Sequence, residues 1–234
     1  MSNVNEVHIK SVKRKTLSKQ VVDQIVGLLT SGQLKPGDKL PSEMELMDKL
    51  YVSRPVLREA LSSLETLGII KRRTREGTFF ADKIGSQPFS FMLALSVGNL
   101  PSIIEARMSL ELGLITLAAE KISDDQLVQL KESIEAIEKS EEDYTKIDRE
   151  FHRIIAFSAS NSIIEGIIDP MLNLFDQTLN QISAEDRDKA KTIEEHRGIY
   201  EALKNHDPVN AYIKMYKHLD HVRNKLMKKV LQSK

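Results

Sequence analysis

The sequence predicts a mainly α-helical protein with two domains: three helices and a β-hairpin in residues 1–83, then an all-helical bundle of about seven helices in residues 88–234. Three observations support this prediction. Apolar residues recur with helical spacing along most of the chain. A basic hairpin follows the third helical segment, and turn-forming residues cluster just after it, at 84–88. At 234 residues, the chain is long enough for each domain to have a core.

Charge separates the two domains. The whole chain has no net charge, but residues 1–83 hold 15 Lys/Arg against 10 Asp/Glu, and the rest hold 19 against 24. A basic head on an acidic body suits a protein that meets phosphate with one end only. The absence of cysteine excludes disulfides and thiolate metal sites, and no apolar run reaches the length of a signal peptide core or a membrane span. We therefore expect a cytoplasmic protein.

Three helices are expected before the hairpin. The first runs from Leu17 to Ser31, with apolar residues along one face. The second follows a proline and has Ser42 as its candidate cap. The third opens after Ser53 and ends at Gly68, because glycine commonly follows the last turn of a helix.

The third helix and the hairpin carry the candidate DNA contacts. Arg54 and Arg58 lie at i, i+4, so both side chains leave one helix face. Arginine is also the side chain best matched to guanine edges and phosphates. Ser53 is expected to cap this helix and touch the DNA backbone, and the hairpin, which turns near Glu76-Gly77, adds positive charge. The candidate DNA-binding residues are Ser53, Arg54, Arg58, Lys71, Arg72, Arg73 and Arg75.

Every segment beyond the boundary has helical periodicity. A short apolar segment at 89–97 precedes a helix at 101–121 that is apolar nearly all round, which predicts a place at the centre of the bundle. An amphipathic helix follows at 124–141. Pro170 is expected to kink or divide a helix at 162–183. The remaining helices are expected at 143–159, 187–205 and 208–231.

Four side chains of the bundle form a candidate metal site. Asp148 and His152 lie at i, i+4 on a helix face with apolar neighbours, and His196 lies among apolar residues of a later helix. In the last helix, the periodicity places His218 beside the apolar stripe, whereas His221 shares its side with lysines. One carboxylate and three imidazoles from three helices could converge in the bundle core. From the residues alone, hydrogen-bonded core histidines and a surface ion pair of Asp148 remain open alternatives.

The head resembles the winged helix-turn-helix of the GntR family of transcription regulators. Family members often carry a DNA-contacting arginine where this chain has Met44, and the wing tip at 74–76 lacks a common glycine. The resemblance implies sequence-specific binding to double-stranded DNA. Because one recognition helix reads only a few base pairs, we expect a homodimer on two-fold related half-sites. The matching runs are Leu40-Pro41-Ser42-Glu43, Val52-Ser53-Arg54, Arg58-Glu59-Ala60-Leu61, Leu64-Glu65, Gly68 and Gly77-Thr78-Phe79.

The bundle resembles the FCD effector domain of the FadR-like subgroup of that family. The subgroup carries a D-x3-H pair, a histidine in an EHR-type helix and a histidine in an HL..V run. The resemblance implies a divalent metal ion at the four matching residues. An oxygen and three nitrogens suit Zn²⁺ first, with Ni²⁺, Co²⁺ or Mn²⁺ as alternatives. The implied metal ligands are Asp148, His152, His196 and His218.

Arg107 lies in a run that matches the family's E-x-R-x-x-L-E pattern. A buried arginine facing a metal could clamp a carboxylate through two hydrogen bonds, and a salt bridge to Glu111 at i+4 is the alternative. The expected function is a transcriptional repressor, not an enzyme, that is released when a small carboxylate metabolite binds between the metal and Arg107. No catalytic residue is assigned, because no general base stands apart from the proposed ligands.

Several alternatives remain open from the sequence. One is a metal-dependent hydrolase with an accessory nucleic-acid-binding head. Another is a DNA-binding regulator whose metal is purely structural, and a third binds an acyl-CoA-like ligand in the bundle. Activation instead of repression also remains open.

Overall fold

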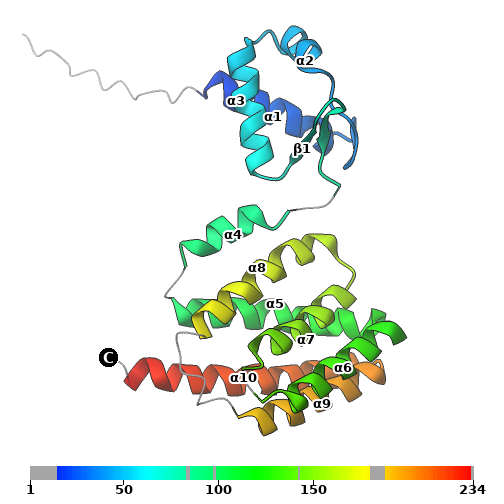
Figure 1. The fold of residues 1–234 in the computed structure, drawn as a ribbon, viewed down its shortest axis with the longest axis vertical. Helices are drawn as coiled ribbons and strands as arrows, with labels where there is room; N and C mark the ends of the chain where they lie inside the picture. The colour runs from blue at the N-terminus through cyan, green and yellow to red at the C-terminus, as the bar shows by residue number, and fades with distance from the viewer. Residues whose placement is uncertain (1–14, 83–84, 97–98, 142, 180–187, 233–234) are drawn as a thin grey trace, which may run out of the picture. The chain divides into compact units, whose positions relative to one another are not determined.

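The computed structural model describes residues 15–82, 85–96, 99–141, 143–179 and 188–232. The chain forms two compact units, Met1–Gly85 and Ser86–Lys234, and the division falls within the interval 84–88 where turn-forming residues cluster. The described residues are mainly helical with one small antiparallel sheet, so the predicted fold class is confirmed (Figure 1).

The first unit combines three helices with a two-stranded sheet. α3 packs against α1, α2 and β1, and the core of the unit lies between these elements. The strands are antiparallel, with Ile70 opposite Phe80 and Arg73 opposite Gly77. The elements are α1 (Leu17–Thr30), α2 (Glu43–Leu50), α3 (Arg54–Thr66), β1 (Ile70–Arg73) and β2 (Gly77–Phe80).

Local signals set the ends of two helices in this unit. At the start of α2, the Ser42 side chain accepts a hydrogen bond from the Glu45 backbone N–H, and the Glu45 carboxylate accepts one from the Ser42 N–H. This capping box satisfies two backbone donors that would otherwise lack partners. α3 ends as predicted at Gly68, where φ is 68° and the backbone N–H of Ile69 bonds back to the Leu64 carbonyl.

One local prediction in this unit is wrong. Ser53 precedes α3, but its side chain makes no cap hydrogen bond. Pro55, in the first turn, removes one of the backbone N–H groups that Ser53 could cap, and nothing in the structure explains why Ser53 does not accept from the next one. The hairpin turns at 74–76, the predicted wing tip, where Arg75 adopts the left-handed conformation (φ 66°) and Gly77, paired with Arg73, has a φ of 116°.

The described part of the second unit consists of seven helices (Figure 1). α5 packs against α7, α8, α9 and α10 and buries residues around much of its circumference, so its predicted central place is confirmed. No helix within the described residues is both long enough and apolar enough to span a membrane. The helices are α4 (Gln87–Ala94), α5 (Leu100–Lys121), α6 (Asp124–Lys139), α7 (Thr145–Ser158), α8 (Ser162–Leu179), α9 (Lys189–Lys204) and α10 (Pro208–Gln232).

α8 continues through Pro170, so the alternative of a divided helix is wrong. Ile168 and Leu172, on either side of the proline, are almost fully buried, and their packing holds both halves of the helix in place. This tertiary packing offsets the missing backbone hydrogen bond. The predicted last turn of this helix, at 180–183, lies outside the described residues.

The capping box makes a stability prediction. Ser42→Ala should lower the free energy of unfolding of the first unit by about 1 kcal/mol, because it removes the side-chain partner of the Glu45 N–H. Urea denaturation followed by circular dichroism measures the change. Ser62→Ala, on the exposed surface of α3, is the matched control and should cause no loss. Equal stability of the two variants would contradict the role of the cap.

Candidate metal centre and nucleic-acid interface

The arginines predicted to contact DNA lie on the exposed surface of α3. Arg54 and Arg58 are both exposed in its N-terminal half. The Arg54 Nε atom is 3.9 Å from the Glu43 Oε2 atom of α2, and both groups are open to solvent. Such a pair contributes little to stability, so little holds the Arg54 side chain to Glu43.

The hairpin presents a second basic surface. The guanidinium of Arg73 lies over the Phe79 ring, 4.7 Å from its centroid, and the Lys39 ammonium is 5.9 Å from the same centroid. Sequence reasoning missed Lys39, because its segment reaches the hairpin only through a bridge to Phe79 across the fold. The four predicted hairpin residues are all exposed: Lys71, Arg72, Arg73 and Arg75.

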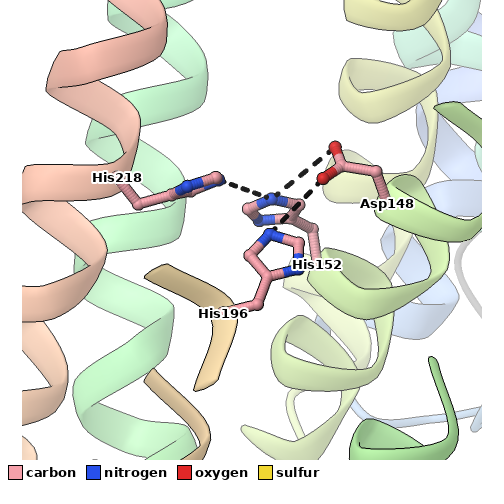
Figure 2. Close-up of side chains that lie close together, drawn as sticks. All are labelled: Asp148, His152, His196 and His218. Carbon is pink, nitrogen blue, oxygen red and sulfur yellow. Dashed lines mark hydrogen bonds and ion pairs between the residues drawn. The ribbon is translucent and has the colours of Figure 1, made fainter. Parts of the chain in front are cut away.

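The second unit brings all four predicted metal ligands together. Figure 2 shows the side chains of Asp148 and His152 from α7, His196 from α9 and His218 from α10 turned toward one another. Their ligand atoms all lie within 4.8 Å of one another. The Nε2 atoms of His152 and His218 are 3.2 Å apart, and the Nε2 atom of His196 is 3.4 Å from the Asp148 Oδ1 atom.

The surface alternative for Asp148 does not hold. Its neighbour Arg149 pairs with Asp176 of α8, at 3.2 Å, and Arg153 pairs with Asp169, at 2.9 Å. Asp148 instead faces two of the imidazoles. The carboxylate is therefore directed at the cluster and not at the basic residues next to it in sequence.

His196 is the clearest sign that the cluster fits a cation. The ring is completely buried and stacks on Phe151, with centroids 3.7 Å apart. Among the described residues, neither of its nitrogens has a hydrogen-bond partner, and Asp148 Oδ1 approaches Nε2 only to 3.4 Å. A buried polar atom without a partner is unfavourable, and a metal ion accepts the lone pair of a neutral imidazole. The alternative of hydrogen-bonded core histidines therefore fails at His196.

The charges around the cluster also favour a divalent cation. Asp148, Glu111 and Glu195 place three carboxylates at or next to the imidazoles, whereas Arg107 contributes one guanidinium. Lys191 reaches Glu195 only at 4.0 Å from the surface. Among the described residues, these buried and half-buried groups leave an excess of two negative charges, or one when Lys191 is counted. Unbalanced buried charge is costly, and a divalent cation would balance it.

Burial and neighbouring charges set the protonation of the cluster. Burial lowers the pKa of His196 well below 6.5, and nearby positive charge on His218, His152 or Arg107 would act in the same direction. Burial also lowers the pKa of His152, against the opposing pull of Glu111. Burial raises the pKa of Glu111, but Arg107 and then His152 outweigh it and bring the pKa to about 2. At neutral pH, His152 and His196 are therefore neutral and able to act as ligands.

Arg107 makes the salt bridge that sequence reasoning kept as an alternative. Its Nε atom donates to Glu111 Oε1, and both side chains are buried. The guanidinium also lies over the Phe175 ring, 4.0 Å from the centroid. The other Glu111 oxygen bonds to His152 Nδ1, so one carboxylate separates Arg107 from the cluster.

Sequence reasoning missed two carboxylates beside the imidazoles. Glu111 contacts His152, and Glu195 Oε2 lies 2.9 Å from His218 Nδ1. Glu111 was considered only as a partner for Arg107. Helical spacing relates Glu195 only to other residues of its own helix, and no pattern in the sequence connects it with a residue of another helix.

The chain is similar over most of its length to known bacterial transcriptional regulators. It is 56% identical over 226 residues to the uncharacterized HTH-type transcriptional regulator YcbG of Bacillus subtilis (strain 168), covering 96% of both chains. HTH-type transcriptional regulator LutR of the same strain is 30% identical over 210 residues, 85% of this chain and 96% of LutR. HTH-type transcriptional repressor NanR of Klebsiella aerogenes is 27% identical over 229 residues, 93% of this chain and 88% of NanR.

Family models and solved structures give the same result. The model of the bacterial regulatory proteins, gntR family, matches residues 17–80, and the FCD domain model matches residues 102–221. Streptococcus agalactiae GntR superposes with a TM-score of 0.65 at 27% identity, over 88% of this chain and 99% of that chain. A GntR family member from Pseudomonas syringae, at 17% identity and a TM-score of 0.50, supports the fold alone.

The exposed face of α3 makes a DNA-binding prediction. Arg58→Ala should weaken binding to an operator fragment isolated from genomic DNA by roughly 10- to 100-fold. It should also reduce the salt dependence of binding if the contact is to phosphate. Fluorescence anisotropy at several salt concentrations measures both quantities. Lys131→Ala, an exposed change on α6, is the control. An equal loss in both variants would contradict a direct contact by Arg58.

The lowered pKa of His196 predicts how pH affects the cation-free protein. The unfolded chain takes up a proton on this imidazole near pH 6.5, whereas the folded chain does so only at lower pH. The free energy of unfolding should therefore fall as pH is lowered from about 7.5 to 5.5, where carboxylates remain ionised. Thermal unfolding of EDTA-treated protein measures this. His196→Leu should flatten the dependence, and an unchanged slope would argue against this role of His196.

Proposed function

The chain belongs to the GntR family of DNA-binding transcriptional regulators, and from this membership we propose that it is a homodimeric repressor whose FCD domain releases DNA when it binds a small carboxylate at a divalent metal ion. The single observation that carries the metal part is the convergence of Asp148, His152, His196 and His218 in the second unit. Zn²⁺ is the first candidate, and Ni²⁺, Co²⁺ and Mn²⁺ also suit three nitrogens and one oxygen.

The need for two half-sites follows from the size of the DNA-binding head. One α3 helix can read only a few base pairs, so useful specificity requires two heads on a two-fold related operator. Arg54 and Arg58 would contact bases or phosphates, Ser53 the DNA backbone, and the basic hairpin the adjacent phosphates. NanR, similar along most of this chain, is named a repressor. A DNA partner places this action in the bacterial cytoplasm.

Arg107 supports a carboxylate as the effector. It is buried and one carboxylate away from the imidazole cluster, and a buried guanidinium next to a bound cation favours anions. Glu111 engages the Nε atom, and a guanidinium has further N–H donors for a second carboxylate. When bound, the metal ion would supply a second point of attachment for a chelating acid.

The response to the effector requires coupling between the two units. A carboxylate that binds one arrangement of the dimer more tightly shifts the population toward that arrangement. If the two heads are then spaced differently from the operator half-sites, the affinity for DNA falls. The same acid should leave the affinity of one head for a single half-site unchanged, because the α3 surface itself is not altered.

A DNA-binding assay with defined metal and acid tests this function. The protein is treated with EDTA, reloaded with Zn²⁺ and bound to a genomic operator fragment, and a panel of small organic acids is then added. Loss of the protein–DNA complex that requires both Zn²⁺ and one acid would support the proposal. If Zn²⁺ raises the melting temperature but no acid affects stability or DNA binding, the metal is structural. If the protein binds no DNA fragment, the regulator function itself is wrong.

Arg107→Lys tests the effector clamp without removing the buried positive charge. Lysine keeps the partner of Glu111 but lacks the planar donors that hold a carboxylate through two bonds. We expect the acid concentration needed for half-release of DNA to rise at least about tenfold, with operator affinity unchanged in the absence of the acid. Anisotropy titrations give both values. An unchanged response to the acid would contradict the clamp.

A further inference from the structure

A continuous chain of contacts crosses the second unit through the imidazole cluster. It begins at a buried guanidinium of α5, passes two of the imidazoles and ends at a half-buried histidine of α10. Carboxylates alternate with the basic groups on both sides of the cluster. In order, its members are Arg107, Glu111, His152, His218, Glu195 and His221.

We propose that Glu111 and Glu195 are positioning residues that hold a hydrogen on Nδ1 of His152 and His218, so that both Nε2 lone pairs are presented to the same divalent cation. This inference rests on the cation of the proposed function and assigns two residues that are not themselves ligands. It also assigns a second use to Arg107, which holds Glu111 in place.

The protonation of the two rings follows from hydrogen-bond chemistry. A carboxylate can only accept hydrogen bonds, so the Nδ1 atom that faces Glu111 in His152, and the one that faces Glu195 in His218, must carry the hydrogen. In a neutral ring, Nε2 then carries a lone pair. The two Nε2 atoms are only 3.2 Å apart, and two lone pairs at that distance repel unless positive charge lies between them. A cation bound by both rings removes this repulsion.

The Glu111 carboxylate is fixed at both of its oxygens. One of its oxygens accepts from Arg107 and the other contacts His152, and the side chain is 3% exposed. Because both oxygens are engaged, the carboxylate cannot rotate away from His152. Such an anionic acceptor fixes the orientation of a metal-binding imidazole and makes its free nitrogen more basic.

Glu195 performs the same task at the edge of the cluster. Its Oε2 atom lies 2.9 Å from His218 Nδ1, and its Oε1 atom lies 3.2 Å from Nδ1 of His221. The His221 side chain is 39% exposed, whereas that of His218 is 3% exposed. The two histidines share this carboxylate but differ in burial, and only the Nε2 atom of His218 contacts His152. His218 faces the cluster, and His221 turns its Nδ1 toward Glu195 from the surface.

Metal affinity of the full-length protein tests the proposal. Co²⁺ and Zn²⁺ are titrated into wild type, Glu111→Gln and Glu195→Ala in competition with a chromophoric chelator. Arg107 and His152 contact different oxygens of Glu111, so a glutamine there presents an NH₂ donor to one of them, and alanine at 195 leaves His218 without its acceptor. Each variant should bind roughly 10- to 100-fold more weakly. His221→Ala is the matched control for Glu195→Ala and should stay within about threefold of wild type.

Nitrogen-15 spectra of the imidazoles provide a readout that a loss of stability alone would not change. In the Zn²⁺-loaded wild type, His152 and His218 should carry hydrogen on Nδ1, and the Nδ1 hydrogen of His218 should exchange faster with water in Glu195→Ala, because its acceptor is gone. Because Glu111 is buried, circular dichroism checks whether Glu111→Gln still folds. If Glu111→Gln is unfolded, Glu195→Ala alone tests the proposal. A wild type that binds neither metal would overturn the proposed cation site and this inference with it. Wild-type metal affinity in a folded Glu195→Ala would overturn this inference alone.

Discussion

The 3.2 Å approach between the Nε2 atoms of His152 and His218 is the constraint on which the site in the second unit depends. Two imidazoles come this close only because α7 and α10 both pack on α5, and α9 adds His196 from a third direction. The same packing buries the nitrogens of His196 without partners. The helical bundle therefore concentrates electron-pair donors at one point, and the surrounding carboxylates make that point strongly attractive to a cation.

The two units of the chain solve different electrostatic problems. In the first unit, positive groups such as Arg58 and Arg75 remain exposed, where water stabilises them until a phosphate replaces it. In the second unit, charged groups such as Arg107 and Glu111 are buried and must find partners inside the protein. Exposed charge gives fast, salt-sensitive association with a polyanion, whereas buried charge gives a rigid site with selective chemistry.

Sequence reasoning succeeded where periodicity alone decides geometry. The spacing of Asp148 and His152 placed both on one face of α7, and the stripe of α10 distinguished His218 from His221. It failed where tertiary contacts decide. Glu111 lies 41 residues before His152 and Glu195 lies 23 residues before His218, so no local pattern could pair them.

The effect of Pro170 in α8 was also misjudged in part, because the packing around it depends on three-dimensional context. The head was predicted more completely than the bundle site. Its helix ends follow short-range rules such as the turn at Gly68, whose left-handed conformation glycine adopts easily. At the wing tip, Gly77 also has a positive φ, of 116°, whereas the left-handed conformation of Arg75 follows from no short-range rule.

Asp148 and His218 lie at the two ends of a long stretch of chain, and an ion held by both would close that stretch into a loop. The chain has no cysteine and therefore no covalent crosslink of its own. Closing a long loop restricts the unfolded chain more than the folded one, and an ion that binds only the folded state adds stability in proportion to the logarithm of its concentration. Metal supply in the cell would then govern the lifetime of this regulator against proteolysis, independently of any effector.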